Sequence, residues 1–139
     1  MAGNTRDQYL ALMAAETALR EAETSLEAFA STAIFGAGTT NGYYDLTNDA
    51  DYTTAGTWTG TDSIVATAIP GVATAPRYYV KLVTCISSAA GGSLGMSGYG
   101  KIKFTGDTQM FSVTARGTGG TDTTASVIRT HYGKVLGSC

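Results

Sequence analysis

The sequence has little charge and few of the residues that build catalytic or metal sites. Only 14% of its 139 residues are charged, the formal net charge is −2, and there is a single histidine. Nucleic-acid binders carry a basic excess along one face, so this composition argues against a nucleic-acid partner. The sequence also lacks an apolar stretch long enough to cross a membrane and a secretory signal pattern, so we expect this chain to be soluble.

Cysteine is equally scarce. Cys85 and Cys139 are the only two, and neither belongs to a CxxC or CxxH pattern, which argues against a metal site. A chain rich in threonine, serine and glycine with sparse charge is typical of exported proteins, in which paired cysteines usually form a disulfide. We therefore expect a Cys85–Cys139 bridge, which the chain-entropy model credits with roughly 4 kcal/mol. An exported type of chain without a signal also suggests that a preceding segment has been removed.

The longest regular pattern is helical and runs from Asn4 to Phe29. Alanine, leucine, glutamate and arginine dominate it, and all are strong helix formers. Its apolar residues recur at spacings of three and four, which predicts an amphipathic helix. The residues expected to pack on the rest of the domain are Leu12, Ala15, Leu19, Ala22, Leu26 and Phe29. Such a helix would be roughly 40 Å long, more than a small domain needs to cover one sheet face.

Residues 31–75 form a turn-rich connecting region. Asn41-Gly42 is a strong two-residue hairpin signal, and short strands are expected at 42–45, 57–61 and 64–68. An acidic cluster in this region has enough oxygen for calcium but lacks the register and closing glutamate of an EF-hand. We favour a turn in which these side chains cap their own backbone. The cluster consists of Asp45, Asn48, Asp49 and Asp51.

Residues 76–139 alternate in the manner of strands. Strands are predicted at Arg77–Cys85, Tyr99–Phe104, Met110–Arg116 and Thr123–Val135. We therefore predict a single α+β domain, residues 1–139, in which one long N-terminal helix packs on a three- to four-stranded antiparallel sheet. Its parts are the helix at 1–30, the connecting region at 31–75, and the sheet with the C-terminal cysteine at 76–139.

Nothing in the sequence supports a catalytic, cofactor or metal site. His131 has no sequence-near carboxylate or nucleophile, and the glycine runs at 36–38 and 117–120 do not end in Gly-Lys-Ser/Thr, so they predict turns. We expect no enzyme activity, no cofactor and no small-molecule substrate. The aromatic residues leave two interpretations open, a sugar or protein contact and a role in the core. They are Trp58 and the pairs Tyr43-Tyr44 and Tyr78-Tyr79.

Charge is distributed unevenly along the chain. Residues 1–76 hold nine acidic and two basic side chains, net −7, whereas residues 77–139 hold seven basic and two acidic ones, net +5. We favour neutralisation within one molecule over head-to-tail stacking of neighbouring subunits, since surface charge alone is weak evidence for assembly.

Both ends of the chain resemble a known family. Residues 1–23, MAGNTRDQYLALMAAETALREAE, resemble the segment that follows the membrane-spanning helix of PilX-type minor pilins. Residues 111–135, FSVTARGTGGTDTTASVIRTHYGKV, are similar to the C-terminal signature of the family, in which a Thr-Ala-Arg-Gly-x-Gly-Gly turn joins two strands. PRYYV at residues 76–80 resembles the strand that opens its sheet. Residues 30–75 carry no such resemblance.

The resemblance implies a pilin-like fold and a structural subunit of the bacterial type IV pilus. A minor pilin of this kind would prime assembly and sit at or near the tip, with other minor and major pilins and a PilY-type tip adhesin as partners. It would reside in the inner membrane and periplasm and then in the extracellular pilus. The sequence lacks the Gly-Phe-Thr-Leu-like processing site and the apolar half of the helix, through which alone it would contact membrane. In pilins a disulfide staples the last sheet segment, the position of Cys85–Cys139.

Two other functions remain open. A type II secretion pseudopilin shares the helix and sheet, and calcium binding by residues 45–51 would favour it. An exported carbohydrate-binding or adhesive domain would use Trp58 and the paired tyrosines, and glycan binding would favour it. An enzyme that depends on His131 is a distant third.

Overall fold

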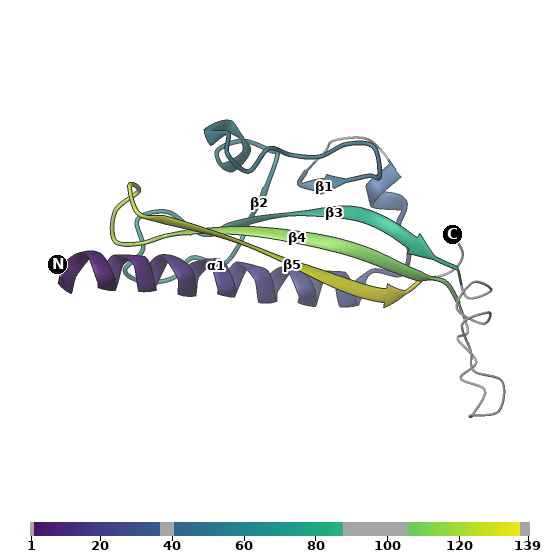
Figure 1. Ribbon diagram of the computed structural model, residues 1–139, viewed down its shortest axis with the longest axis horizontal. Coiled ribbons are helices and arrows are strands. Elements are labelled where there is room, and N and C mark those ends of the chain that lie inside the picture. Colours follow the sequence, from purple (N-terminus) through teal and green to yellow (C-terminus); the bar gives the residue numbers. More distant parts are fainter. Residues whose placement is uncertain (1, 37–40, 88–105, 137–139) are drawn as a thin grey trace, which may run out of the picture.

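The computed structural model describes residues 2–36, 41–87 and 106–136. One long helix, α1 (Ala2–Ala28), lies along one face of a sheet, and much of the connecting region lies over the opposite face (Figure 1). Another part of this region reaches α1, where the Thr67 amide donates to the Glu21 carboxylate. The predicted fold class is confirmed, because the long N-terminal helix packs on a sheet as expected. No helix in the described ranges is both long enough and apolar enough to cross a membrane.

The three long strands form the antiparallel part of the sheet. They are β3 (Arg77–Ile86), β4 (Thr108–Thr118) and β5 (Ala125–Val135), each within two residues of its prediction. Two short strands, β1 (Tyr43–Tyr44) and β2 (Ile64–Val65), pair with β3, the first parallel and the second antiparallel. The sheet therefore has five strands and is mixed, not three- to four-stranded and antiparallel as expected. The strand expected at Tyr99–Phe104 lies outside the described residues.

The connecting region differs from the prediction in two places. The prediction of a strand at 57–61 is wrong, because Ala55–Trp58 forms a 3-10 helix. Two side chains of this helix donate hydrogen bonds to carbonyls six residues earlier in the chain. These bonds run from Thr57 to the Asp51 carbonyl and from the Trp58 ring to the Tyr52 carbonyl. Asn41 and Gly42 have the positive φ angles of a hairpin turn, yet β1 pairs parallel with β3. A second 3-10 helix spans Ala33–Gly36.

Alanines form the face of α1 that meets the sheet. Leu26 and five alanines on this face are at most 1% exposed, whereas Leu19 and Phe29 are partly buried against the same core. Leu12, expected to pack on the sheet, is 38% exposed, so that prediction is wrong. The helix turns its smallest residues inward, because they let its backbone approach β4 closely. The five buried alanines are Ala11, Ala14, Ala15, Ala18 and Ala22.

Two glycines at the end of β4 complete this close approach. A Cβ atom on Gly117 would lie 2.7 Å from the Ala14 side chain and closer still to the α1 backbone, and one on Gly119 would lie 2.5 Å from the Asp7 carbonyl oxygen. Gly117 is part of β4, so the turn predicted at 117–120 begins later than expected. The Arg-Gly-x-Gly-Gly sequence is therefore the place where the sheet touches the helix backbone.

Lys134 of β5 binds the C-terminal end of α1. Its ammonium group donates to the carbonyls of Leu26 and Phe29, each at 2.9 Å, and to that of Glu27. A cation at this end satisfies carbonyls without a helical partner and complements the helix dipole. One charge of the basic half thus meets the helix within the same molecule, through carbonyls and not through carboxylates.

Candidate subunit-interaction surfaces

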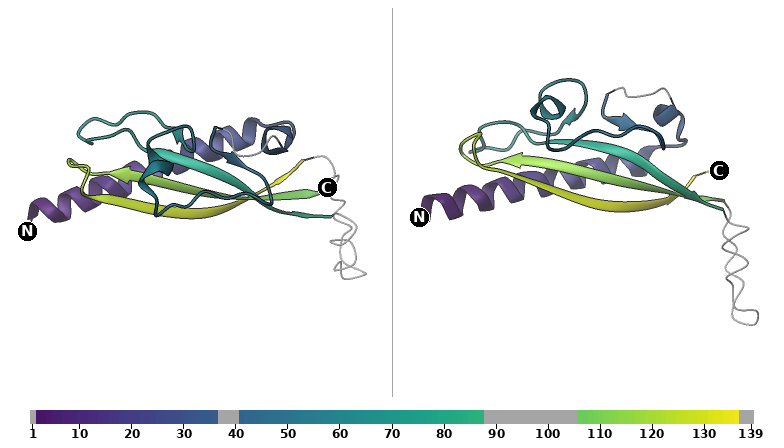
Figure 2. Two further views of the ribbon diagram at one scale, coloured as in Figure 1. Left: turned by 90° about the horizontal axis from the view of Figure 1, so that it is seen from above. Right: turned by 45° about the horizontal axis from the view of Figure 1, so that its top comes forward.

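The outward side of α1 carries an apolar stripe near its N-terminal end. Tyr9 is 64% exposed, Leu12 38% and Met13 46%, and their spacing of three and four residues places them side by side. The opposite side of the same turns is the buried alanine face. The first turns of α1 also project beyond the end of the sheet (Figure 1; Figure 2), and residues 3–6 are exposed. Exposed apolar side chains that lie together make this stripe a candidate contact surface for another molecule.

Three buried aromatic residues attach the connecting region to the second face of the sheet, the face opposite α1. Tyr44, Trp58 and Tyr79 pack together and are at most 5% exposed. Each donates a hydrogen bond to a connecting-region carbonyl, at 2.7 Å for Tyr44 and 2.9 Å for Trp58. Burial, with the nearby Asp62 carboxylate, raises the pKa of Tyr44 to about 12.

These contacts leave little of Trp58 and the paired tyrosines exposed to a sugar. Tyr78 is buried in the helix-side core, and Tyr43 packs edge-on against Phe29 and Phe35. Burial, with the neighbouring Tyr78, raises the pKa of Tyr43 to about 12 as well. The core interpretation of Trp58 and the paired tyrosines is therefore confirmed, and the carbohydrate hypothesis loses the residues on which it depended.

The acidic cluster caps its own backbone, as the sequence predicts. One Asp45 carboxylate oxygen accepts hydrogen bonds from the amides of Thr47 and Asn48, and one Asp51 oxygen accepts one from the amide of Thr53. Hydrogen bonds from the Thr47 and Thr53 hydroxyls are the main reason why the pKa values of Asp45 and Asp51 are lowered. Within the described ranges, no group of three or more His, Cys, Asp and Glu side chains is placed to hold a metal.

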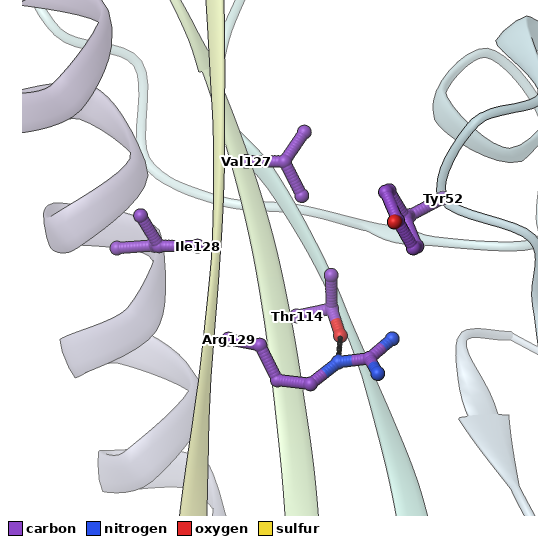
Figure 3. Close-up of a pocket in the computed structure, with 5 residues that line it drawn as sticks. All are labelled: Tyr52, Thr114, Val127, Ile128 and Arg129. Carbon is purple, nitrogen blue, oxygen red and sulfur yellow. Dashed lines mark hydrogen bonds between the residues drawn. The ribbon is translucent and has the colours of Figure 1, made fainter.

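An open pocket of about 250 Å³ lies on the second face, between the connecting region and β5. Tyr52, Thr114, Val127, Ile128 and Arg129 line it (Figure 3). Arg129 lies between the sheet and Tyr52, whereas Ile128 points toward α1. The Arg129 guanidinium donates to the Thr114 hydroxyl at 2.9 Å and to the Tyr79 hydroxyl at 3.2 Å, and its carbon is 5.7 Å from the Tyr52 ring centre.

Sequence reasoning did not single out Arg129, although the alternation of β5 places it on the face opposite Ile128. His131 shares the Arg129 side of β5, is exposed, and is paired with Ser112 in the register. Within the part of the chain that the structure describes, no hydrogen bond links His131 to a carboxylate or nucleophile.

Cys85 is half-buried near the end of β3. Cys139 lies outside the described residues, so the bridge stays a prediction. The strand register favours it, because Cys85 pairs with Gln109 and Gln109 pairs with Lys134. Two strand spacings, about 9.5 Å, separate Cys85 from Lys134, and the five residues from 134 to 139 reach farther than that.

Comparisons with curated proteins and with solved structures found no match. A protein family does match, with the description "Type IV pilus assembly protein PilX C-term", over residues 34–134. The matched region covers the connecting region from residue 34, strands β1 to β4 and β5 up to residue 134, including the glycines that contact α1. The chain therefore belongs to the PilX family of type IV pilus assembly proteins.

Proposed function

We propose that the chain is a minor pilin, a structural subunit that primes type IV pilus assembly and sits at or near the tip. The observation that carries this proposal is the exposed stripe of Tyr9, Leu12 and Met13 on a helix whose other side is packed on its own sheet. A helix with one free apolar side, projecting beyond the sheet, is suited to pack against the helices of neighbouring subunits.

The proposed partners are other minor pilins, the major pilin and a PilY-type tip adhesin. The subunit would reside in the inner membrane and periplasm before assembly and in the extracellular pilus afterwards. Membership of a pilus assembly family supports this location. The resemblance of residues 1–23 to the segment that follows a membrane-spanning helix supports attachment through a helix that would precede Met1.

Complementation in the source bacterium tests the proposal. Deleting the gene should strongly reduce surface pili counted by electron microscopy, and the wild-type gene should restore them. A Leu12→Glu/Met13→Glu double variant should restore few, because charge on the stripe opposes burial between helices. Leu46→Glu is the matched control, since Leu46 is 55% exposed in the connecting region, away from α1.

Each part of the proposal can fail separately. Normal pilus numbers in the deletion strain would exclude a priming role. Full activity of the double variant would exclude the stripe as an interface. Gold-labelled antibody along the whole filament, in place of a signal at its end, would exclude the tip position.

A further inference from the structure

Three arginines share the second face of the sheet, and one of them, Arg129, lines the pocket of Figure 3. Arg77 of β3 lies directly opposite Arg116 of β4, and Arg116 lies opposite Val127 of β5. Arg129 is two residues beyond Val127 and therefore on the same face. Like charges directly opposite each other on neighbouring strands destabilise a sheet. A counter-charge at this place would remove that cost.

Within the described residues, no hydrogen bond joins these arginines to a carboxylate. Arg77 donates to the Gly60 carbonyl at 2.7 Å and to the Ser63 hydroxyl, and Arg129 binds two hydroxyl groups. Arg116 is half-buried and makes no side-chain hydrogen bond within the described residues. None of the three meets a carboxylate there. Each guanidinium has five N–H donors, and the hydrogen bonds above use at most two of them on Arg77 and two on Arg129.

The surroundings fit a carboxylate carried on a short aliphatic stem. Val127 is 40% exposed and Tyr52 is 50% exposed, so they offer apolar walls beside the guanidinium groups. Carboxylates bind guanidinium through two parallel hydrogen bonds, which are stronger than bonds between neutral groups. An aspartate or glutamate side chain has both the stem and the head that this arrangement accommodates.

We propose that Arg77, Arg116 and Arg129 bind an acidic segment of a neighbouring pilus subunit, with Arg116 making the main contact to a carboxylate. The proposal rests on the pilus function proposed above. Charge complementarity favours a protein partner, since residues 1–76 of this chain itself carry net −7 and its Glu16 and Glu27 are exposed. The composition left open whether the acidic half of one subunit attracts the basic half of the next. Such head-to-tail stacking would use this surface.

A sugar acid is less well suited to the site. Sugar rings bind by stacking on free aromatic faces, and three of the aromatic residues on this face are buried. The Tyr52 ring already has the Arg129 guanidinium over it, at 5.7 Å from the ring centre. The remaining recognition groups are cations and short apolar walls, which suit an acidic peptide.

Binding of a labelled hexaglutamate peptide to the 139-residue chain, followed by fluorescence anisotropy at low salt, tests the site. Hexaglutamate should bind, hexaglutamine should not, and raising the salt should weaken binding. Arg116→Gln should weaken binding about tenfold, because one charged bidentate contact is lost. Arg20→Gln removes the same charge from the exposed side of α1 and should leave affinity unchanged. Neither variant should have a lower unfolding midpoint than the wild type, and Arg116→Gln should raise it slightly because the repulsion from Arg77 is lost. A loss of binding is then separate from a loss of folding.

Equal hexaglutamate affinity of the wild type and Arg116→Gln would overturn the proposal. The proposal would also be overturned if trigalacturonate displaced the labelled peptide at a lower concentration than unlabelled hexaglutamate. That result would assign the site to sugar acids. Co-purification with other pilus subunits distinguishes this failure from that of the pilus function. If Arg116→Gln co-purifies as well as the wild type, the arginine site is wrong while the pilus role stands. If the wild-type chain co-purifies with none, the pilus role is wrong, and the peptide result still decides the site.

Discussion

At the scale of single residues, Gly117 limits how closely the sheet can approach α1. A Cβ there would lie 2.7 Å from the Ala14 Cβ and nearer still to backbone atoms of Ala11 and Ala15. Backbone atoms of a helix cannot move aside as the end of a flexible side chain can. The Gly-x-Gly part of the C-terminal signature is thus a packing requirement, and glycine is the only residue small enough for it.

Replacing Gly117 with alanine should lower the free energy of unfolding by about 3 kcal/mol, because an added methyl group forces β4 and α1 apart. Urea denaturation followed by circular dichroism measures the change. Gly3→Ala is the matched control, since its Cβ meets nothing within 4 Å and alanine favours helix. A wild-type midpoint for Gly117→Ala would show that helix and sheet are not in this close contact.

Ionisation of two buried tyrosine hydroxyls should lower the free energy of unfolding at alkaline pH. Burial raises the pKa of Tyr43 and of Tyr44 from 10.0 to about 12. Because the folded value exceeds the unfolded one, the stabilisation is complete below pH 10 and is lost as pH rises toward 12. Tyrosinate absorbance should therefore show a component near pH 12 that Tyr44→Phe reduces and that Tyr9→Phe, at an exposed position, leaves in place. A titration with all tyrosines ionised by pH 11 would contradict this.

At the scale of elements, α1 has two sides with different tasks. The alanine side packs on β4, and the side with Tyr9, Leu12 and Met13 faces solvent. Lys134 holds the C-terminal end against β5, whereas Gly117 and Gly119 fix its other half. The helix is therefore held at its C-terminal end and between Asp7 and Ala15, while its first turns project beyond the sheet. Its outward side is left free for contacts with another molecule.

The same substitution at two positions of α1 distinguishes these sides. Leu26→Ala should cost about 2–5 kcal/mol, because Leu26 is 1% exposed and its removal leaves a cavity. Leu12→Ala should cost less, about 1 kcal/mol, since Leu12 is 38% exposed and lies outside the core that α1 shares with the sheet. Thermal or urea unfolding of the isolated chain measures both, and helix propensity is the same in the two cases. Equal losses would show that Leu12 packs on the sheet after all.

Periodicity alone was sufficient to predict the helix and the three long strands. It did not show which side of the helix is buried, because alanine and leucine are both apolar and only close contact with Gly117 selects the smaller ones. The short strands β1 and β2 depend on β3 for their hydrogen bonds, so local sequence locates them poorly. The arginine surface was missed for a related reason. Arg77, Arg116 and Arg129 are far apart in sequence, and only the strand register brings them together.

At the scale of the whole molecule, the sheet separates two surfaces that a subunit in a filament could use simultaneously. Helix α1, whose outward side carries the stripe, lies on one side of the sheet (Figure 1), and the arginines lie on the opposite face. The surfaces differ in chemistry, one apolar and one basic. A heterologous contact, in which one side of a subunit meets a different side of the next, generates an extended assembly and not a closed dimer. This arrangement fits a member of a pilus family better than a surface with a single patch would.

Closure of the C-terminal part of the chain by a disulfide is the remaining prediction at this scale. The register places Cys85 two strands from Lys134, within reach of a cysteine five residues later. The bridge would close a long loop containing β4 and β5, and its reduction should lower the free energy of unfolding by roughly 4 kcal/mol.

Mass spectrometry before and after alkylation should detect no free thiol in the oxidised protein. A Cys85→Ser/Cys139→Ser variant should have the stability of the reduced wild type and should not respond to reductant. Two alkylated cysteines in protein exported to the periplasm would contradict the bridge. The strand pairing and the Lys134 contact with α1 would then be what stabilises this end of the sheet.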